Sequence, residues 1–312
     1  MAGMPDASAS RRPSRPRLLV LDVDGTLTNS RHEVTDATRR AVARIRAAGI
    51  RVMLATGRRY RDTLPVAESL GITDPIVTAS GALVKRPGDH TTLFRAEFAP
   101  GVLQGVLATI VAAGHEPVLY SDSFASSFDF HCRRLGGEGQ GGGDRGVRRS
   151  LDEYLDRNRS LADVVPDLHV NPPGGVFAGF TMGTHDGMLA LERSLDDAFP
   201  GRLSLHTIRS PRYREWMCEI APAGVTKWSG VLALAAGWGL APADICAVGD
   251  DVNDLPMIRG AGHGIAMGNA RPEVQAAADT VVSGHDQDGL ADVADLLLTT
   301  GLDEPAPTGT VA

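Results

Sequence analysis

Short apolar runs alternate with amphipathic stretches over most of the chain. Buried strands are predicted from the runs LLVL, IRVMLAT and PIVTAS, at residues 18–21, 50–56 and 75–80. A helix is predicted over residues 35–49, where apolar side chains recur every three or four positions; Thr35 or Asp36 can cap its start and Gly49 can end it. Strands that alternate with helices in this way predict a parallel, doubly wound sheet, whose ligands collect at the carboxyl ends of the strands.

The rhythm changes after Gly81, where strands such as TTLFRAEF and FAGFTMG alternate with helices such as PGVLQGVLATIVAAG. It returns with a helix in VTKWSGVLALAAGWG and strands in DICAVGD, HGIAMG and DTVVS. We therefore predict the α/β class: a doubly wound parallel-sheet (Rossmann-like) core of residues 17–82 and 221–300, with an inserted α+β domain of residues 83–220. Residues 1–16 and 301–312 are predicted to be a disordered leader and tail, and the glycine-rich stretch 135–146 a loop.

Composition narrows the class of protein. The 312 residues are 43% hydrophobic and carry a formal net charge of −7, so the chain has no overall basic character for binding nucleic acid. No apolar run reaches the roughly 18 residues of a membrane span. Three scattered cysteines form no disulfide framework, as is typical of a reducing compartment. We expect a cytoplasmic protein without a nucleic-acid or membrane partner; its oligomeric state is not predicted.

Two carboxylates follow the first strand directly. Asp22 and Asp24 stand one residue apart, before Gly25, and such close carboxylates repel each other unless a cation or a shared proton compensates. On its own this motif is equally typical of an acidic turn made by the glycine.

Three further motifs follow other predicted strands or start a helix. Thr56-Gly57-Arg58 could bind an anion or simply begin a helix. Asp250 and Asp254, with Asn253 between them, could hold a cation or be an acidic helix start, and Lys227 could be a solvated lysine. Because all of these positions lie at the same edge of a parallel sheet, we expect them to converge on one crevice.

These segments carry a family resemblance. LDVDGTL, LATGR, GVTK and VGDDVND resemble the four motifs of the haloacid-dehalogenase-like (HAD) hydrolase superfamily. The insertion between the second and third motifs resembles the type II cap of its Cof-type (IIB) phosphatases, and the resemblance extends from Arg17 to Leu298. One departure is Ser80, where that branch usually has Asn, and it bears on the junction between core and cap.

The resemblance implies a mechanism. Asp22 would be the nucleophile that becomes an aspartyl-phosphate, and Asp24 the general acid–base. Mg²⁺ would be held by the carboxylates of Asp22 and Asp250 and the backbone carbonyl of Asp24, with Asp254 behind them. The substrate's phosphoryl group would be bound by Gly25, Thr56, Gly57, Arg58, Lys227 and Asn253. An Asp with an ordinary pKa near 3.9 is a ready nucleophile, but it is a poor acid unless its surroundings raise that pKa.

The expected activity is that of a Mg²⁺-dependent phosphatase for small phosphorylated metabolites, such as monoesters of sugars or cofactors, because a large cap would admit only small substrates. A sugar phosphomutase and a non-catalytic metabolite-binding regulator are the alternatives. His32 and His263 are not expected to be ligands. The polar residues of the insertion that could recognise the leaving group are Asp122, His131, Arg133, Arg134, His169, Arg212 and Arg214.

Overall fold

A computed structural model describes residues 15–136, 150–210 and 212–299. Nearly all of the predicted leader, all of the predicted tail and most of the glycine-rich stretch lie outside the described residues. Among the helices that are described, none has the length and apolar character needed to cross a membrane.

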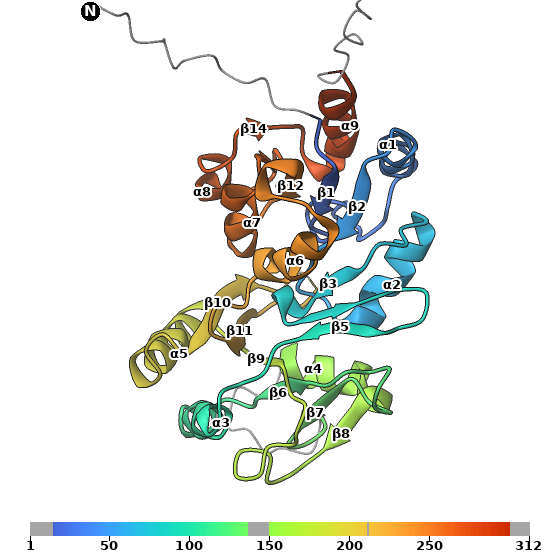
Figure 1. Cartoon of the computed structure of the whole chain (residues 1–312). Coiled ribbons are helices and arrows are strands. Elements are labelled where there is room, and N and C mark those ends of the chain that lie inside the picture. The colour runs from blue at the N-terminus through green and yellow to red at the C-terminus, as the bar shows by residue number, and fades with distance from the viewer. Residues whose placement is uncertain (1–14, 137–149, 211, 300–312) are drawn as a thin grey trace, which may run out of the picture.

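A parallel sheet of five strands forms the first layer, in the order β14-β13-β12-β1-β2 (Figure 1). Its strands, from that edge to the other, are Thr280–Val281, His263–Ala266, Ile245–Gly249, Leu18–Leu21 and Arg51–Leu54. All their pairings are parallel, and β1 lies between β12 and β2. The expected α/β class with a parallel sheet is confirmed.

Both faces of this sheet are covered, because alternate side chains of each strand point to opposite sides. Leu19 and Leu21 of β1 pack with helices α1 (Asp36–Ala47) and α9 (Gly289–Thr299). Leu18 and Val20 pack on the other side with α6 (Lys227–Ala235) and α7 (Leu255–Gly260). Helix α1 begins as predicted, because the Thr35 side chain accepts a hydrogen bond from the Thr38 N–H and caps the first turn.

A small antiparallel sheet continues from the edge of β2. Its strands are β3 (Ile76–Thr78), β4 (Leu83–Lys85) and β5 (Thr92–Arg95), and an isolated parallel bridge joins Ala55 to Val77. Helix α2 (Tyr60–Ser69) connects β2 to β3. The pairing of β4 with β3 joins the start of segment 83–220 to the strands of the core. The predicted boundary between core and inserted domain, between residues 82 and 83, stays a prediction.

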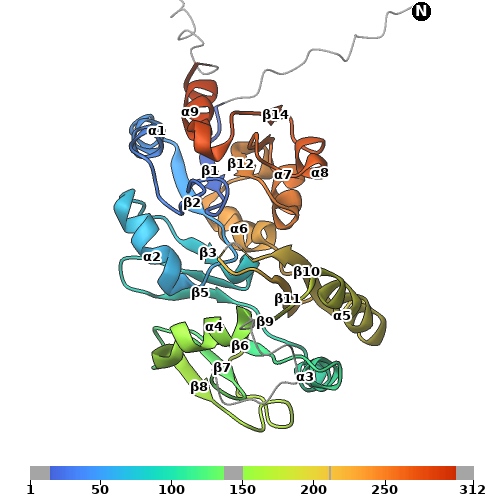
Figure 2. The same ribbon diagram turned by 180° about the vertical axis from the view of Figure 1, so that it is seen from behind.

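A separate six-stranded sheet is built from the middle of the chain, in the order β10-β11-β9-β6-β7-β8. We call it the second sheet; Figure 2 shows it, from behind, on the far side of β3–β5 from α1 and α9. Its strands are Leu203–Arg209, Trp216–Pro222, Ala178–Gly183, Val118–Tyr120, Phe130–Cys132 and Ala162–Val164. Helices α3 (Val102–Ala112) and α5 (His185–Ala198) cover one face.

The opposite face of the second sheet turns toward the first layer. Helix α4 (Ser150–Arg157) packs there through Tyr154 against Phe130 and Phe180. Helix α8 (Pro272–Gln275) lies beside β13. Near α6, strands β10 and β11 bring this face close to the carboxyl ends of the parallel strands (Figure 1).

Candidate active site

A buried lysine joins two carboxylates at the carboxyl end of β1. The Lys227 Nζ donates to Asp22 Oδ1 and to Asp254 Oδ1, both at 2.7 Å. All three side chains are almost completely buried. Lys227 is the first residue of α6, whose start is fixed by a capping box between Thr226 and Ser229.

A third carboxylate, Asp250, lies beside them at the end of β12. Its Oδ1 accepts a hydrogen bond of 3.0 Å from Thr26, a residue of the turn that follows β1. Gly25 in that turn has a φ of +77°, and a Cβ on it would lie 2.2 Å from Asp250 Oδ2. The position therefore requires glycine, both for its left-handed backbone and for the close approach of the carboxylate.

Two of these carboxylates, Asp22 and Asp250, have raised pKa values. Burial raises the pKa of Asp22 to about 7, although Lys227 opposes this, and burial together with the charge of Asp22 raises the pKa of Asp250 to about 9. The two carboxylates raise the pKa of Lys227 despite the opposing effect of burial. Lys227 is thus held as a cation, but its charge does not compensate for all of the negative charge.

Asp24 is paired with an arginine. The Arg58 guanidinium donates from Nε to Asp24 Oδ2 at 2.7 Å and from Nη2 to Oδ1 at 2.5 Å, a bidentate geometry. His32 Nδ1 lies 3.5 Å from the same carboxylate. Burial favours a higher pKa for Asp24, but the hydrogen bonds and charge of Arg58, with Arg212 and His32, hold it below its ordinary value. This is the opposite of what a general acid needs.

The predicted phosphate-binding residues meet between β2, the loop after β3 and the start of α7. Thr56 is buried, and its Oγ1 accepts a hydrogen bond of 3.2 Å from the Arg58 N–H. A Cβ on Gly57 would lie 4.0 Å from Asn253 Nδ2 and 3.3 Å from Ser80 Oγ. The structure therefore brings Thr56, Gly57 and Asn253 together beside the carboxylates; their roles remain proposals.

The donor set fits a hard divalent cation. Carboxylate oxygens of Asp22, Asp250 and Asp254 all lie within 4.8 Å of one another. Both oxygens of Asp254 already have donors: Oδ1 accepts from Lys227, and Oδ2 accepts from the backbone N–H groups of Asp250 and Asp251. Asp22 and Asp250 are therefore the better ligands, with Asp254 fixing the loop that carries Asp250.

Comparison with known proteins identifies the family. A family model for haloacid dehalogenase-like hydrolases matches residues 19–293. This chain is a haloacid dehalogenase-like hydrolase.

Two curated proteins and a solved structure illustrate its relatives. The hydrolase is 27% identical to the phosphatase YwpJ of Bacillus subtilis, over 88% of this chain and 97% of YwpJ. It is 25% identical to the 5-amino-6-(5-phospho-D-ribitylamino)uracil phosphatase YitU of the same organism, over 89% and 96%. The crystal structure of a haloacid dehalogenase-like hydrolase from Bacteroides thetaiotaomicron covers 90% of this chain and 99% of its own, with a TM-score of 0.72 and 24% identity.

Most of the polar candidates in the middle of the hydrolase have local partners. Asp122 accepts from Lys85 at 2.5 Å, and His131 Nδ1 lies 2.9 Å from Asp163. Arg133 and Arg134 pair with Glu116. His169 has a buried Nδ1, and the charge of Arg212 acts on Asp24. Arg214 is exposed, and His263 Nε2 lies 2.9 Å from Thr280 Oγ1.

Glu219 of β11 is a site residue that the motifs do not indicate. Its Oε2 accepts a hydrogen bond of 2.7 Å from Ser80, and a Cβ on Gly57 would lie 3.0 Å from its Oε1. Burial raises the pKa of Glu219, while the Ser80 hydrogen bond opposes the rise. The only signal in the sequence is alternation, because Glu219 stands between the buried Cys218 and Ile220 and must face the other way.

Asn269 is a second residue near the site that the sequence motifs do not indicate. Its Nδ2 donates to the Gly25 carbonyl at 2.8 Å, which fastens the turn carrying Asp24 to the loop after β13. The contact joins residues 244 positions apart in the chain, so local patterns do not reveal it.

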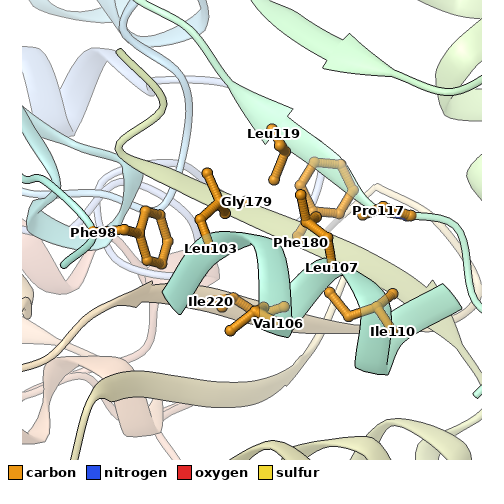
Figure 3. Close-up of a pocket in the computed structure, with 10 residues that line it drawn as sticks. All are labelled: Phe98, Leu103, Val106, Leu107, Ile110, Pro117, Leu119, Gly179, Phe180 and Ile220. Atoms are coloured by element: carbon orange, nitrogen blue, oxygen red, sulfur yellow. The ribbon is translucent and has the colours of Figure 1, made fainter. Parts of the chain in front are cut away.

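A cavity under α3 does not belong to this site. It has a volume of about 10 Å³ and lies between the helix and the second sheet (Figure 3). Figure 3 shows Val106 and Ile220 among its lining residues, and all of the described lining residues are apolar, proline or glycine. It therefore offers no group for catalysis.

Proposed function

We propose that the hydrolase is a Mg²⁺-dependent phosphatase that acts on small phosphorylated metabolites through an aspartyl-phosphate. The observation that carries this proposal is the contact of Lys227 with Asp22 and Asp254 beside Asp250. This contact supports the proposal because a carboxylate that could act as the nucleophile lies beside a buried cation and two further carboxylates, which is the kind of electrostatic arrangement that phosphoryl transfer needs.

Asp22, Asp250 and the backbone carbonyl of Asp24 would hold Mg²⁺. The ion would neutralise charge on the phosphoryl oxygens and allow the close carboxylates to remain ionised together. Asp254 would keep Asp250 in place through its backbone hydrogen bond.

Two displacements at phosphorus would follow. In the first, an oxygen of the Asp22 carboxylate attacks phosphorus, the ester P–O bond breaks, and the leaving oxygen takes a proton from Asp24. In the second, Asp24 takes a proton from water, the water oxygen attacks phosphorus, and the Asp22–phosphorus bond breaks to release inorganic phosphate. Thr56, the backbone at Gly25 and Gly57, Asn253 and Lys227 would bind the phosphoryl oxygens throughout.

Arg58 would have to change partners for Asp24 to act as the acid. While the guanidinium pairs with Asp24, it favours the ionised carboxylate. We infer that the substrate's phosphoryl oxygens draw Arg58 away from Asp24. Removal of this cation would raise the pKa of Asp24 and let it carry the proton that the leaving group requires.

The substrate class follows from two supporting points. The second sheet faces the site, and the segment 83–220 that carries it would act as a cap over the site, excluding bulk water and large substrates. YitU is named for a small phosphorylated metabolite, and YwpJ is named a phosphatase. We propose a small phosphorylated metabolite as substrate and a cytoplasmic location for the enzyme.

A panel of phosphorylated metabolites tests the proposal, with release of inorganic phosphate measured with Mg²⁺ and with excess chelator. We expect release from at least one ester that stops in chelator. Interconversion of isomers without net phosphate release would instead show a phosphomutase. Binding without any turnover would show a metabolite-binding regulator, and full activity in chelator would contradict the metal assignment.

A further inference from the structure

A cleft separates the loop after β3 from the second sheet. It is narrow, with a cavity volume of about 10 Å³, and is partly open to solvent. Ala79 and Val225 are among its apolar lining, and its polar side chains are those of Ser80, Tyr120, Ser204, His206 and Glu219. This polar lining adjoins the proposed phosphoryl site, because Glu219 and Ser80 both lie beside Gly57.

Glu219 is the acidic residue among those that line this cleft. One of its oxygens, Oε2, is used by Ser80, but among the described residues no donor bonds to Oε1. The Oε1 atom lies near Gly57, where an added Cβ would be 3.0 Å away. A carboxylate oxygen without a donor therefore lies beside one of the residues that we propose to bind the phosphoryl group.

The orientation of Glu219 is fixed from both sides. In β11, Cys218 and Ile220 are buried against α3 and α5, so Glu219 must point toward the first layer. Ser80 has a φ of +54°, and Gly81 beside it has no room for a Cβ, which would lie 2.0 Å from the Thr226 carbonyl. The loop that carries the Ser80 hydroxyl is thus held against the start of α6. Rotation of the Glu219 carboxylate away from this hydroxyl would break their hydrogen bond and cost free energy.

We propose that Glu219 Oε1 accepts a hydrogen bond from a hydroxyl group on the leaving part of the substrate. The enzyme would then prefer phosphate esters of neutral, polyhydroxylated compounds and would discriminate against leaving groups that carry a second anionic group. This inference rests on the proposed phosphatase function. A hydrogen bond to a charged acceptor is strong enough to matter for selectivity, and a second anion near the carboxylate would be repelled.

Three esters with the same three-carbon skeleton test it. Propyl phosphate offers no hydroxyl group, glycerol phosphate offers two, and phosphoglycerate carries a carboxylate. For the wild-type enzyme with Mg²⁺, we expect kcat/KM for glycerol phosphate to exceed that for each of the other two by about 10- to 100-fold. In Glu219→Ala, both ratios should fall toward one. In Glu219→Gln, which keeps an acceptor oxygen without the charge, only the preference over phosphoglycerate should fall.

Two controls separate recognition from structure. Glu97→Ala removes an exposed carboxylate of the same segment and should leave both ratios as in the wild type. Ser80→Ala removes the partner of Oε2. If Glu219 served only to hold this loop in place, Ser80→Ala and Glu219→Ala would slow hydrolysis of all three esters in equal proportion. That result would overturn the inference. Unchanged ratios in Glu219→Ala would also overturn it. If the wild-type enzyme hydrolysed no ester at all, the proposed function itself would fail.

Discussion

Lys227 is the residue on which the site's charge balance depends. It is 2% exposed and holds Asp22 and Asp254 at hydrogen-bonding distance. An ammonium group buried at this depth is costly unless its attraction to carboxylates offsets the lost hydration, and two carboxylates do so here. Its removal would leave two buried acids without their nearest cation.

We therefore expect Lys227→Met to lower both stability and activity. The free energy of unfolding should fall by about 3–5 kcal/mol, because one partner of a buried ion pair is removed. Turnover should fall by at least about 100-fold, through loss of charge stabilisation at the phosphoryl group. Denaturant unfolding and phosphate release measure the two effects.

The matched control is Arg44→Gln, which breaks an ion pair with Asp295 on the exposed faces of α1 and α9. Its effect on unfolding should be at most about 1 kcal/mol, and its turnover should match the wild type. A Lys227→Met protein as stable as this control would contradict the assigned ion pair.

At the scale of elements, the site is made by turns that follow parallel strands. The turn after β1 carries Asp24 and Gly25, the turn after β2 carries Thr56, and the turn after β12 carries Asp250. Parallel strands end at a common edge, so residues more than 200 positions apart in the chain become neighbours. Two of these turns approach closely at Gly25, where an added Cβ would lie 2.2 Å from Asp250 Oδ2.

Gly25→Ala should therefore weaken the metal site. The new methyl group would overlap Asp250 Oδ2, which must move, and we expect the Mg²⁺ concentration for half-maximal activity to rise at least about 10-fold. Gly49→Ala is the control: its φ is +82°, but a Cβ there meets nothing within 4 Å. It should carry only the left-handed backbone strain of about 1–2 kcal/mol. An equal Mg²⁺ requirement in both variants would contradict the proposed crowding.

Predictability from the sequence also differs between elements. The core strands and α1 were predicted within a few residues, because buried parallel strands are continuous apolar runs between helices with caps. The carboxylates Asp22 and Asp250 were visible because they follow such runs directly. Glu219 was not visible in this way, because a strand position shows only which face of the sheet a side chain takes. The Asp24–Arg58 pair was not visible either, because pairing between distant parts of the chain depends on tertiary contacts.

At the scale of the molecule, two halves of the site meet across segments distant in sequence. Arg61 of α2 donates to Asp129, just before β7, at 3.0 Å, and Ser80 donates to Glu219 at 2.7 Å. The carboxylates at the strand ends are partly or wholly removed from water. Stability of the whole fold should therefore depend on how their charge is compensated.

We expect the thermal midpoint of the cation-free protein to fall as the pH rises. Between the ordinary Asp value of 3.8 and the raised pKa values of about 7 for Asp22 and about 9 for Asp250, the folded state holds protons that the unfolded state has released. The free energy of unfolding therefore decreases with pH across that window. Saturating Mg²⁺ should replace these protons, so the gain in midpoint on adding it should be larger at about pH 9 than at about pH 6.

Asp250→Asn is the control for this dependence, because an amide cannot ionise. Its midpoint in the absence of Mg²⁺ should vary less with pH than that of the wild type, and Mg²⁺ should raise it less. A cation-free wild-type protein that became more stable between about pH 7 and about pH 9 would contradict the assigned direction of these pKa shifts.

The most direct test of the account is to trap the covalent intermediate with Asp22→Asn and Asp24→Asn proteins and an aryl phosphate, whose leaving group needs no proton. In Asp24→Asn the nucleophile remains but water activation fails, so a phosphorylated protein should accumulate and be cleaved by hydroxylamine, as acyl phosphates are. Asp22→Asn should show none. Phosphorylated protein or undiminished turnover in Asp22→Asn would contradict the assignment of Asp22 as the nucleophile, and undiminished turnover in Asp24→Asn would contradict the assignment of Asp24 as the acid–base.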